Sequence, residues 1–159
     1  MEQAIVSAFT HDMSEAKMTL AGLPDHPGVA ARVFRSLSDL GVNVDMIVQN
    51  VSAQGVTDIS FTVPHEDLAK TQETASALVA ELGASEILVD AAIARVSVVG
   101  AGMRSNPGVA ATMFEVLAAE EITIAMISTS AIRVSCVVEQ ARVEDAVRAL
   151  HEAFGLSVV

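Results

Sequence analysis

The sequence repeats itself over almost its whole length, and this repeat restricts the possible folds more than any other feature. When the sequence is shifted by 80 positions, residues 22–47 align with residues 102–127, and ten of the 26 aligned residues are identical. The block PGVAAxxF occurs at both 27–34 and 107–114. Further correspondences are DISFTV at 58–63 with RVSCVV at 133–138, Leu78 with Leu150, and Gly83 with Gly155. Because such self-similarity identifies a repeated structural unit, we expect two domains of about 75 residues each.

The first copy has the pattern of a βαββαβ unit. A strand at KMTLAGL is followed by Pro27, which suits a first helical position because a helix does not need the N–H there. Apolar residues then recur at spacings of three and four until Gly41, which is typical of a helix that ends at a glycine. Two β-branched runs, VNVDMIVQNV and VTDISFTV, are joined by SAQG, where Gly55 can adopt a positive φ. A second helical stripe over 68–82 ends at Gly83, and SEILVDA is again strand-like.

The second copy repeats this order but lacks most of its last strand. A strand at ARVSVVG, a helix from Pro107, two more strands and a helix from about Ala141 use up the chain, so that only LSVV remains. The N-terminus, in contrast, carries a spare apolar strand, QAIVSAFT. Because a lone apolar strand would expose an unpaired edge, residues 3–9 are predicted to cross over to the second sheet. The predicted fold is α+β with antiparallel sheets, and its segments are 1–15 (the joining strand), 16–91 (domain 1) and 92–159 (domain 2).

Composition excludes several classes of function. The chain carries 20 acidic and 9 basic side chains, a formal charge of −11, and only 3% of its residues are aromatic. Neither the basic surface nor the stacking rings that nucleic acid requires are provided. No apolar stretch approaches the ~18 residues of a membrane span, and the first residues, with an early Glu2 and no basic segment, do not resemble a secretory signal. We expect a soluble, cytoplasmic protein with no nucleic-acid and no membrane partner.

Catalysis finds no support in the sequence. The four histidines, His11, His26, His65 and His151, fall in predicted loops or on predicted helix surfaces without an evident partner, whereas a nucleophile needs a base and an orienting group within reach. Cys136 lies in an apolar run and is interpreted as a buried core thiol. The string VVGAGMRSNPG fails as a dinucleotide fingerprint because its third glycine comes too late and a hairpin follows. The sequence predicts no catalytic residue, no cofactor and no metal site.

The loops LPDHPGVAA and MRSNPGVAA, each at the predicted start of a helix, are the most informative segments. Glycine and small alanines there leave the first backbone N–H groups of the helix open, and these donors favour a carboxylate together with the positive end of the helix dipole. An anion site is one interpretation. The other is a plain helix start, in which His26 and Asn106 are N-cap residues before a proline and the glycine permits close packing.

These residues carry a family resemblance. A βαββαβ repeat with D-x-P-G in its strand-to-helix loop resembles the ACT domain, a small ferredoxin-like module that senses amino acids. The segments SEAKMTLAGLPDHPGVAARVFRSL, VNVDMIVQNVS, DISFTV, VGAGMRSNPGVAATMFEVL, ISTSAIRVS and ALHEAFGL are similar to the tandem ACT regulatory region of aspartate kinase, which some bacteria make as a separate small subunit. The resemblance implies a non-catalytic subunit that partners a catalytic aspartate kinase chain and mediates feedback inhibition of aspartate-family amino-acid biosynthesis.

The resemblance also implies where an effector, usually threonine, would bind. It places the effector between the first ACT unit of one chain and the second unit of a homodimer partner, with the carboxylate on backbone N–H groups near Gly28. Without the resemblance, Asp25 reads as an exposed turn residue and Gln49 as a solvent-facing strand residue. The implied effector-binding residues are Asp25, Pro27, Gly28, Val29, Ala30, Asn43, Asp45, Gln49, Thr123 and Ile124, and a second, less complete site comprises Val109, Ala110, Ser130 and Ala131.

Departures from the family pattern bear on the effector. Ala131 stands where the family usually has a glutamate that suits a lysine ammonium, and Ala110 stands where a threonine is common. Thr123 and Ala125 replace residues that tend to be asparagine and glutamate. The second site thus loses a charged partner, and the resemblance favours threonine over lysine. Two other functions stay open: an effector-insensitive assembly subunit of the kinase, and a stand-alone ACT sensor for another enzyme or a transcription factor.

Overall fold

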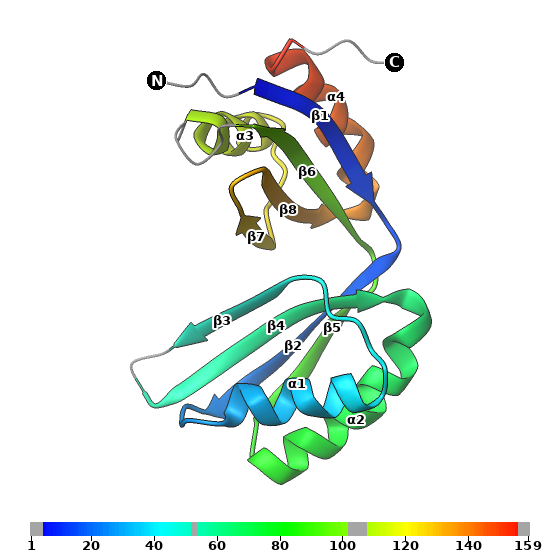
Figure 1. The fold of residues 1–159 in the computed structure, drawn as a ribbon, viewed down its shortest axis with the longest axis vertical. Coiled ribbons are helices and arrows are strands. Elements are labelled where there is room, and N and C mark those ends of the chain that lie inside the picture. The colour runs from blue at the N-terminus through cyan, green and yellow to red at the C-terminus, as the bar shows by residue number, and fades with distance from the viewer. Residues whose placement is uncertain (1–4, 52–53, 102–107, 156–159) are drawn as a thin grey trace. The chain divides into compact units, whose positions relative to one another are not determined.

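The computed structural model describes residues 5–51, 54–101 and 108–155, and it divides into two compact units (Figure 1). We call Ser14–Ala91 the central unit, and Met1–Met13 together with Ala92–Val159 the terminal unit. Each unit holds one four-stranded antiparallel sheet. No helix in the three described ranges is long and apolar enough to cross a membrane.

The central unit has the predicted βαββαβ order. Its sheet order is β3-β4-β2-β5, so the second strand of the unit, β3, lies at one edge and its last strand, β5, at the other. Each of its two helices therefore connects strands that are not neighbours in the sheet. The elements are β2 (Glu15–Pro24), α1 (Val29–Asp39), β3 (Ile47–Val51), β4 (Val56–Pro64), a 3-10 turn η1 (His65–Asp67), α2 (Leu68–Leu82) and β5 (Glu86–Asp90).

The core of the central unit follows from the two periodicities of its sequence. Alternate residues of β2 and β4 point to one face of the sheet, and these side chains, such as Leu20 and Phe61, are fully buried. The helices present their buried residues to the same cluster at spacings of three and four, as with Val33 and Leu37 in α1. The ring of Phe34 also packs edge-on against Phe61, with 5.7 Å between ring centroids.

The terminal unit repeats this architecture with a strand from the other end of the chain. Its sheet order is β1-β6-β8-β7, in which β1 takes the edge position that β5 holds in the central unit. The elements are β1 (Ile5–Asp12), β6 (Ile93–Ala101), α3 (Gly108–Ala119), β7 (Met126–Thr129), β8 (Arg133–Glu139), a 3-10 turn η3 (Gln140–Arg142) and α4 (Val143–Ala153).

The predicted crossover of the N-terminal strand is confirmed. Strand β1 pairs antiparallel with β6, with Ile5 opposite Ala101 and Phe9 opposite Val98. The Phe9 ring packs against His151 of α4 and against Phe154, the C-cap of that helix, at centroid distances of 4.8 and 5.5 Å. Both the edge of β6 and one side of α4 are therefore covered by the spare strand.

The equivalence of the copies extends to the turns that end their first helices. In the central unit the N–H groups of Gly41 and Val42 donate to the carbonyls of Ser38 and Leu37, and Gly41 has φ 74°. The terminal unit makes the corresponding bonds with Glu121 and Ile122, but here Glu121 has φ 57°. A left-handed conformation costs a residue with a Cβ about 1–2 kcal/mol. Glu121 is the one non-glycine residue with positive φ among the described residues.

We therefore expect Glu121→Gly to stabilise the terminal unit. The substitution removes the left-handed strain but adds about 0.4–1 kcal/mol of unfolded-chain entropy, so the free energy of unfolding should rise by up to about 1.5 kcal/mol. Urea unfolding with an unchanged m-value would measure this gain. The neighbouring variant Glu120→Gly has no such strain to relieve and should lower stability. Equal effects of the two variants would contradict the explanation.

Candidate functional site

The loop between β2 and α1 is fixed to the tip of the β3–β4 hairpin. The N–H of Asp25 donates to the carbonyl of Gly55 at 2.9 Å, and the N–H of His26 donates to the carbonyl of Pro24 at 3.2 Å. These bonds use the backbone only. The side chain of Asp25 is exposed at the end of the sheet where α1 begins.

Helix α1 begins later than the sequence predicts. Its N-cap is Gly28, with φ 95°, and its first residue is Val29 rather than Pro27. His26 is therefore not the N-cap; one of its ring nitrogens lies 3.1 Å from the carbonyl oxygen of Pro27. The prediction was wrong because the left-handed Gly28 delays the helical path by two residues. A Cβ on Gly28 would meet no atom within 4 Å, so the glycine serves its φ and not close packing. Asn106 lies outside the described residues.

The first turn of α1 leaves donors open. The helix has no side-chain cap and no acidic residue in this turn. The N–H of Val29 makes one long bond, 3.4 Å, to the carbonyl of His26, while in the described ranges the N–H groups of Gly28 and Ala30 reach no acceptor. Open donors at the positive end of a helix dipole favour a carboxylate or another anion. Asp25 adds a carboxylate at the mouth of the same turn, which suits a ligand that also carries a cationic group.

Of the other predicted residues of the central unit, Asn43 and Asp45 lie away from this loop and Gln49 lies between. The N–H of Asp45 donates to the carbonyl of Thr62, whereas Asp25 bonds Gly55. The two acceptors are seven residues apart, which corresponds to about 24 Å along a strand. Asn43 and Asp45 therefore lie at the opposite end of the sheet, in the exposed connection that leads into β3. Gln49 is exposed on the edge strand β3, opposite Ile59 and between the two ends.

The sheet of the terminal unit has the same two ends as that of the central unit: one where the first helix begins, and one where the connection into the next strand runs. Thr123 and Ile124 lie in the connection from α3 to β7, where the N–H of Ala125 donates to the carbonyl of Val137, 2.8 Å away, as Asp45 does to Thr62 in the other copy. The remaining predicted residues lie at the end where α3 begins. Val109 is buried and Ala110 half-buried in the first turn of α3, and Ser130 and Ala131 are exposed in the turn between β7 and β8.

One exposed feature of the edge strands could not be recognised from the sequence. Ile47 on β3 and Ile127 on β7 keep 53% and 43% of their surface exposed, and both lie on edge strands. They are equivalent positions of the repeat. The signal was present in the duplicated Met-Ile pair, but an isoleucine in a strand reads as a core residue until its strand is known to lie at an edge.

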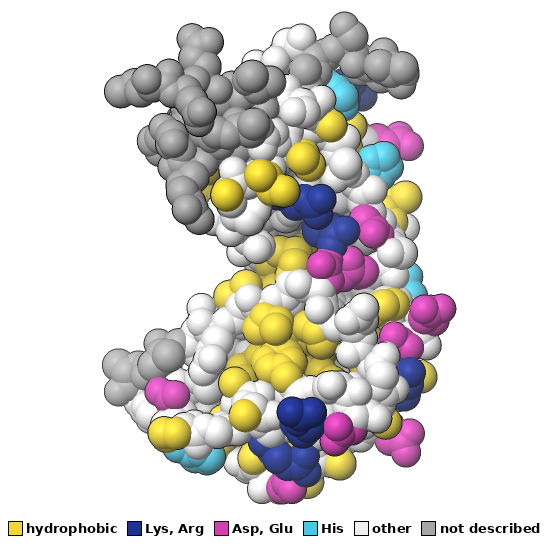
Figure 2. Space-filling view, viewed as in Figure 1, with side chains coloured by type: hydrophobic (Ala, Val, Ile, Leu, Met, Phe, Trp, Pro, Cys, Tyr) yellow, Lys and Arg dark blue, Asp and Glu magenta, His cyan; other side chains and the backbone are white. Residues whose placement is uncertain are grey.

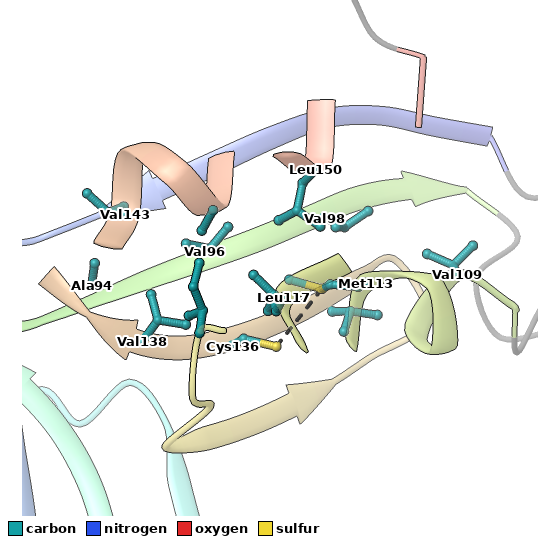
Figure 3. Packing of buried hydrophobic residues seen from close by; sticks show 13 residues of the cluster. Ala94, Val96, Val98, Val109, Met113, Leu117, Cys136, Val138, Val143 and Leu150 are labelled. Atoms are coloured by element: carbon teal, nitrogen blue, oxygen red, sulfur yellow. Dashed lines mark hydrogen bonds between the residues drawn. The ribbon is translucent and has the colours of Figure 1, made fainter. Parts of the chain in front are cut away.

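Two of the histidines and the cysteine, the side chains that could act as base or nucleophile, make contacts within the fold. His65 was predicted to lack a partner, which is wrong: its Nε2 lies 3.0 Å from the carbonyl oxygen of Ala91. His151 is half-buried against Phe9 rather than free on a helix surface, and its buried Nδ1 has no hydrogen-bond partner among the described residues, as predicted. Burial raises the pKa of the Cys136 thiol to about 12. That thiol donates to the sulfur of Met113 at 4.0 Å inside the core of the terminal unit (Figure 3), so it is held in its unreactive protonated form.

A family model for the ACT domain matches residues 19–78 and 96–154. Among curated proteins, the chain is 51% identical over 158 residues to the aspartokinase of Mycolicibacterium smegmatis and 51% identical over 156 residues to that of Pseudomonas aeruginosa strain PAO1. Each alignment covers 98% of this chain and 38% of the relative. The chain therefore spans well under half the length of these curated relatives.

Solved structures correspond to the chain over nearly its full length. A structure of aspartokinase alpha and beta subunits matches with a TM-score of 0.90 and 44% identity, covering 96% of this chain and 100% of that one. The ligand-free regulatory subunit of aspartate kinase from Thermus thermophilus matches with a TM-score of 0.89 and 38% identity, covering 94% and 98%. With two ACT domains and this end-to-end correspondence, the chain belongs to the ACT-domain family and corresponds to the regulatory part of aspartate kinases.

Proposed function

We propose that this chain binds a free amino acid, threonine, at an interface between two copies of itself and thereby inhibits an aspartate kinase catalytic chain. The observation that carries the proposal is the first turn of α1, where the open N–H groups of Gly28 and Ala30 lie beside the exposed carboxylate of Asp25. The resemblance to regulatory subunits of aspartate kinase supports the kinase as the target.

The chemistry of this turn matches an amino-acid zwitterion. The backbone N–H groups at the start of α1 would donate hydrogen bonds to the ligand carboxylate, as those of helix N-termini generally do. The carboxylate of Asp25 would accept a hydrogen bond from the ammonium or hydroxyl group, and the amide of Gln49 on β3 offers a further polar contact. A ligand with a carboxylate and an ammonium group would satisfy both the open N–H groups and the carboxylate of Asp25. A simple anion would be repelled by Asp25.

A second copy would supply the opposite wall. Antiparallel pairing of β3 in one chain with β7 in the other would cover the exposed Ile47 and Ile127. It would also place the helix-start end of the central unit against the connection that precedes β7 in the partner, where Thr123 and Ile124 lie. The second set of residues would meet in the same way: Asn43 and Asp45 of one chain would face the start of α3 in the other, with Val109, Ala110, Ser130 and Ala131.

Regulation follows from linkage. A ligand that binds a site which neither monomer completes favours the dimer, and its effect grows with ligand concentration. A coupling of about 1–3 kcal/mol to the kinase would change its activity about 5- to 150-fold. Accumulated threonine would in this way stabilise an inactive arrangement of the catalytic chain.

Titration calorimetry combined with sedimentation tests the proposal. We expect L-threonine to release or absorb heat on binding and to shift the chain from monomer to dimer, while D-threonine, which cannot satisfy the same donors and acceptors together, should do neither. L-lysine tests the second set of residues and should bind more weakly, because Ala131 and Ala110 offer it no charge. Absence of heat and of any change in mass at millimolar L-threonine would refute effector binding.

The alanines of the second set favour one alternative function, an effector-insensitive assembly subunit of the kinase. In that case the chain should dimerise and bind the catalytic chain equally well with and without amino acids. Sedimentation of the mixture with the catalytic chain, repeated over a series of threonine concentrations, separates the two functions.

A further inference from the structure

The outer surface of α1 carries a stripe of four residues at helical spacing: Ala31, Phe34, Arg35 and Ser38. With Arg32 they line a shallow groove of about 570 Å³. The stripe lies near the edge of the sheet, because Phe34 packs on Phe61 and Phe61 pairs with Ile47 of the edge strand β3. Figure 2 shows hydrophobic side chains gathered over this part of the central unit.

The repeat places the same stripe on α3. Shifted by 80 positions, the four residues become Ala111, Phe114, Glu115 and Ala118. Three of the four pairs are identical or similarly small, and Phe114 is half-buried against the core of its unit as Phe34 is. The pair that differs in kind is Arg35 and Glu115, whose charges have opposite sign.

These two charges are available for an intermolecular contact. Arg35 and Glu115 are exposed, and neither makes an ion pair with another residue of the described ranges. The neighbouring Arg32 is already occupied: its guanidinium contacts both carboxylate oxygens of Glu81 at 2.9 Å. Arg35 is therefore the uncompensated charge of the α1 stripe, and Glu115 that of the α3 stripe.

The charges distinguish the possible pairings of two chains. If like units paired through their stripes, Arg35 would face Arg35 of the partner subunit, and Glu115 would face Glu115 of the partner subunit. If the central unit of each chain paired with the terminal unit of the other, both contacts would join opposite charges. Juxtaposed like charges at an interface disfavour the wrong partner strongly.

We propose that Arg35 and Glu115 determine which unit pairs with which, so that α1 of one chain docks on α3 of a second copy. The inference rests on the proposed dimerisation through β3 and β7, and it adds the residues that select the pairing. The occupant of the α1 groove is the α3 stripe of the second copy.

Two charge reversals test the selection. Arg35→Glu makes both stripes acidic, and Glu115→Arg makes both basic, so each variant alone should dimerise at least about tenfold more weakly than the wild type. When the two variants are mixed, both contacts again join opposite charges. Native mass spectrometry, which separates the chains by mass, should then show a heterodimer almost exclusively. The double variant Arg35→Glu/Glu115→Arg should dimerise like the wild type.

The controls separate this inference from a failure of the proposed function. Arg148→Glu reverses an exposed charge on α4 and should leave dimerisation unchanged, and the single-variant defects should shrink at high salt because exposed charges are screened. Single variants that dimerise normally, or a mixture that forms no heterodimer, would overturn the selection while the dimer itself stands. A wild-type chain that stays monomeric with and without threonine would overturn both.

Discussion

Deletion of residues 2–12 is expected to unfold the terminal unit while the central unit keeps its fold. The deletion removes β1, exposes the edge of β6, and takes Phe9 away from His151 of α4 and from its C-cap Phe154. Loss of the half-buried Phe9 side chain alone costs up to about 3 kcal/mol, and a whole domain is stable by only about 5–15 kcal/mol. Among the described residues, no strand of the central unit pairs with β1.

Hydrogen exchange followed by mass spectrometry can score the two units separately. Amides of β6 and β8 should lose their protection in the deletion variant, and those of β2 and β4 should retain it. Phe9→Ala should give an intermediate loss, up to about 3 kcal/mol because the ring is only half-buried. Thr10→Ala, exposed on the same strand, should change stability by less than about 0.5 kcal/mol. Full protection of β6 without β1 would show that the sheet does not depend on the crossover.

Asp25→Ala is expected to remove the response to threonine and leave the fold intact. A hydrogen bond to a charged group contributes about 1.5–3 kcal/mol, so the dissociation constant should rise about 10- to 150-fold. The loop itself should not move, because the N–H of Asp25, and not its side chain, holds it to Gly55. Calorimetry measures the affinity and thermal unfolding measures the fold.

Two further carboxylates make matched controls for this substitution. Asp39→Ala removes an exposed charge at the other end of α1 and should leave threonine affinity unchanged. Asp45→Ala removes a carboxylate that belongs, in the proposed pairing, to the second set of residues, and should also spare threonine binding. An Asp25→Ala chain that binds threonine normally would place the effector elsewhere, and a defect in Asp45→Ala alone would move it to the opposite end of the sheet.

Most of the fold could be predicted because the repeat and the hydrophobic periodicity agree. The crossover of β1 followed from one missing strand and one spare strand, since a sheet edge must be covered. The start of α1 could not be predicted in the same way. Proline before glycine reads as a first helical turn, but the positive φ of Gly28 is a property of the folded loop and leaves no separate mark in the sequence.

The candidate site was predicted as a set of residues but not as an arrangement. Asp25 and Gly28 lie at one end of the central sheet, as expected of neighbours in the chain, whereas Asn43 and Asp45 lie at the other end. Which residues share an end depends on the direction of β3, which only the folded sheet defines. For the same reason the exposure of Ile47 was not foreseen.

The crossover of β1 has a consequence for how the protein is made. Asp12 contacts Arg95, 83 positions later in the chain, so the terminal unit is interrupted by the whole central unit. During synthesis on the ribosome the first strand emerges long before any partner, and it must wait until the central unit has been translated. We therefore expect the central unit to acquire its structure first, as a folded insertion that brings β1 and the nascent β6 close together.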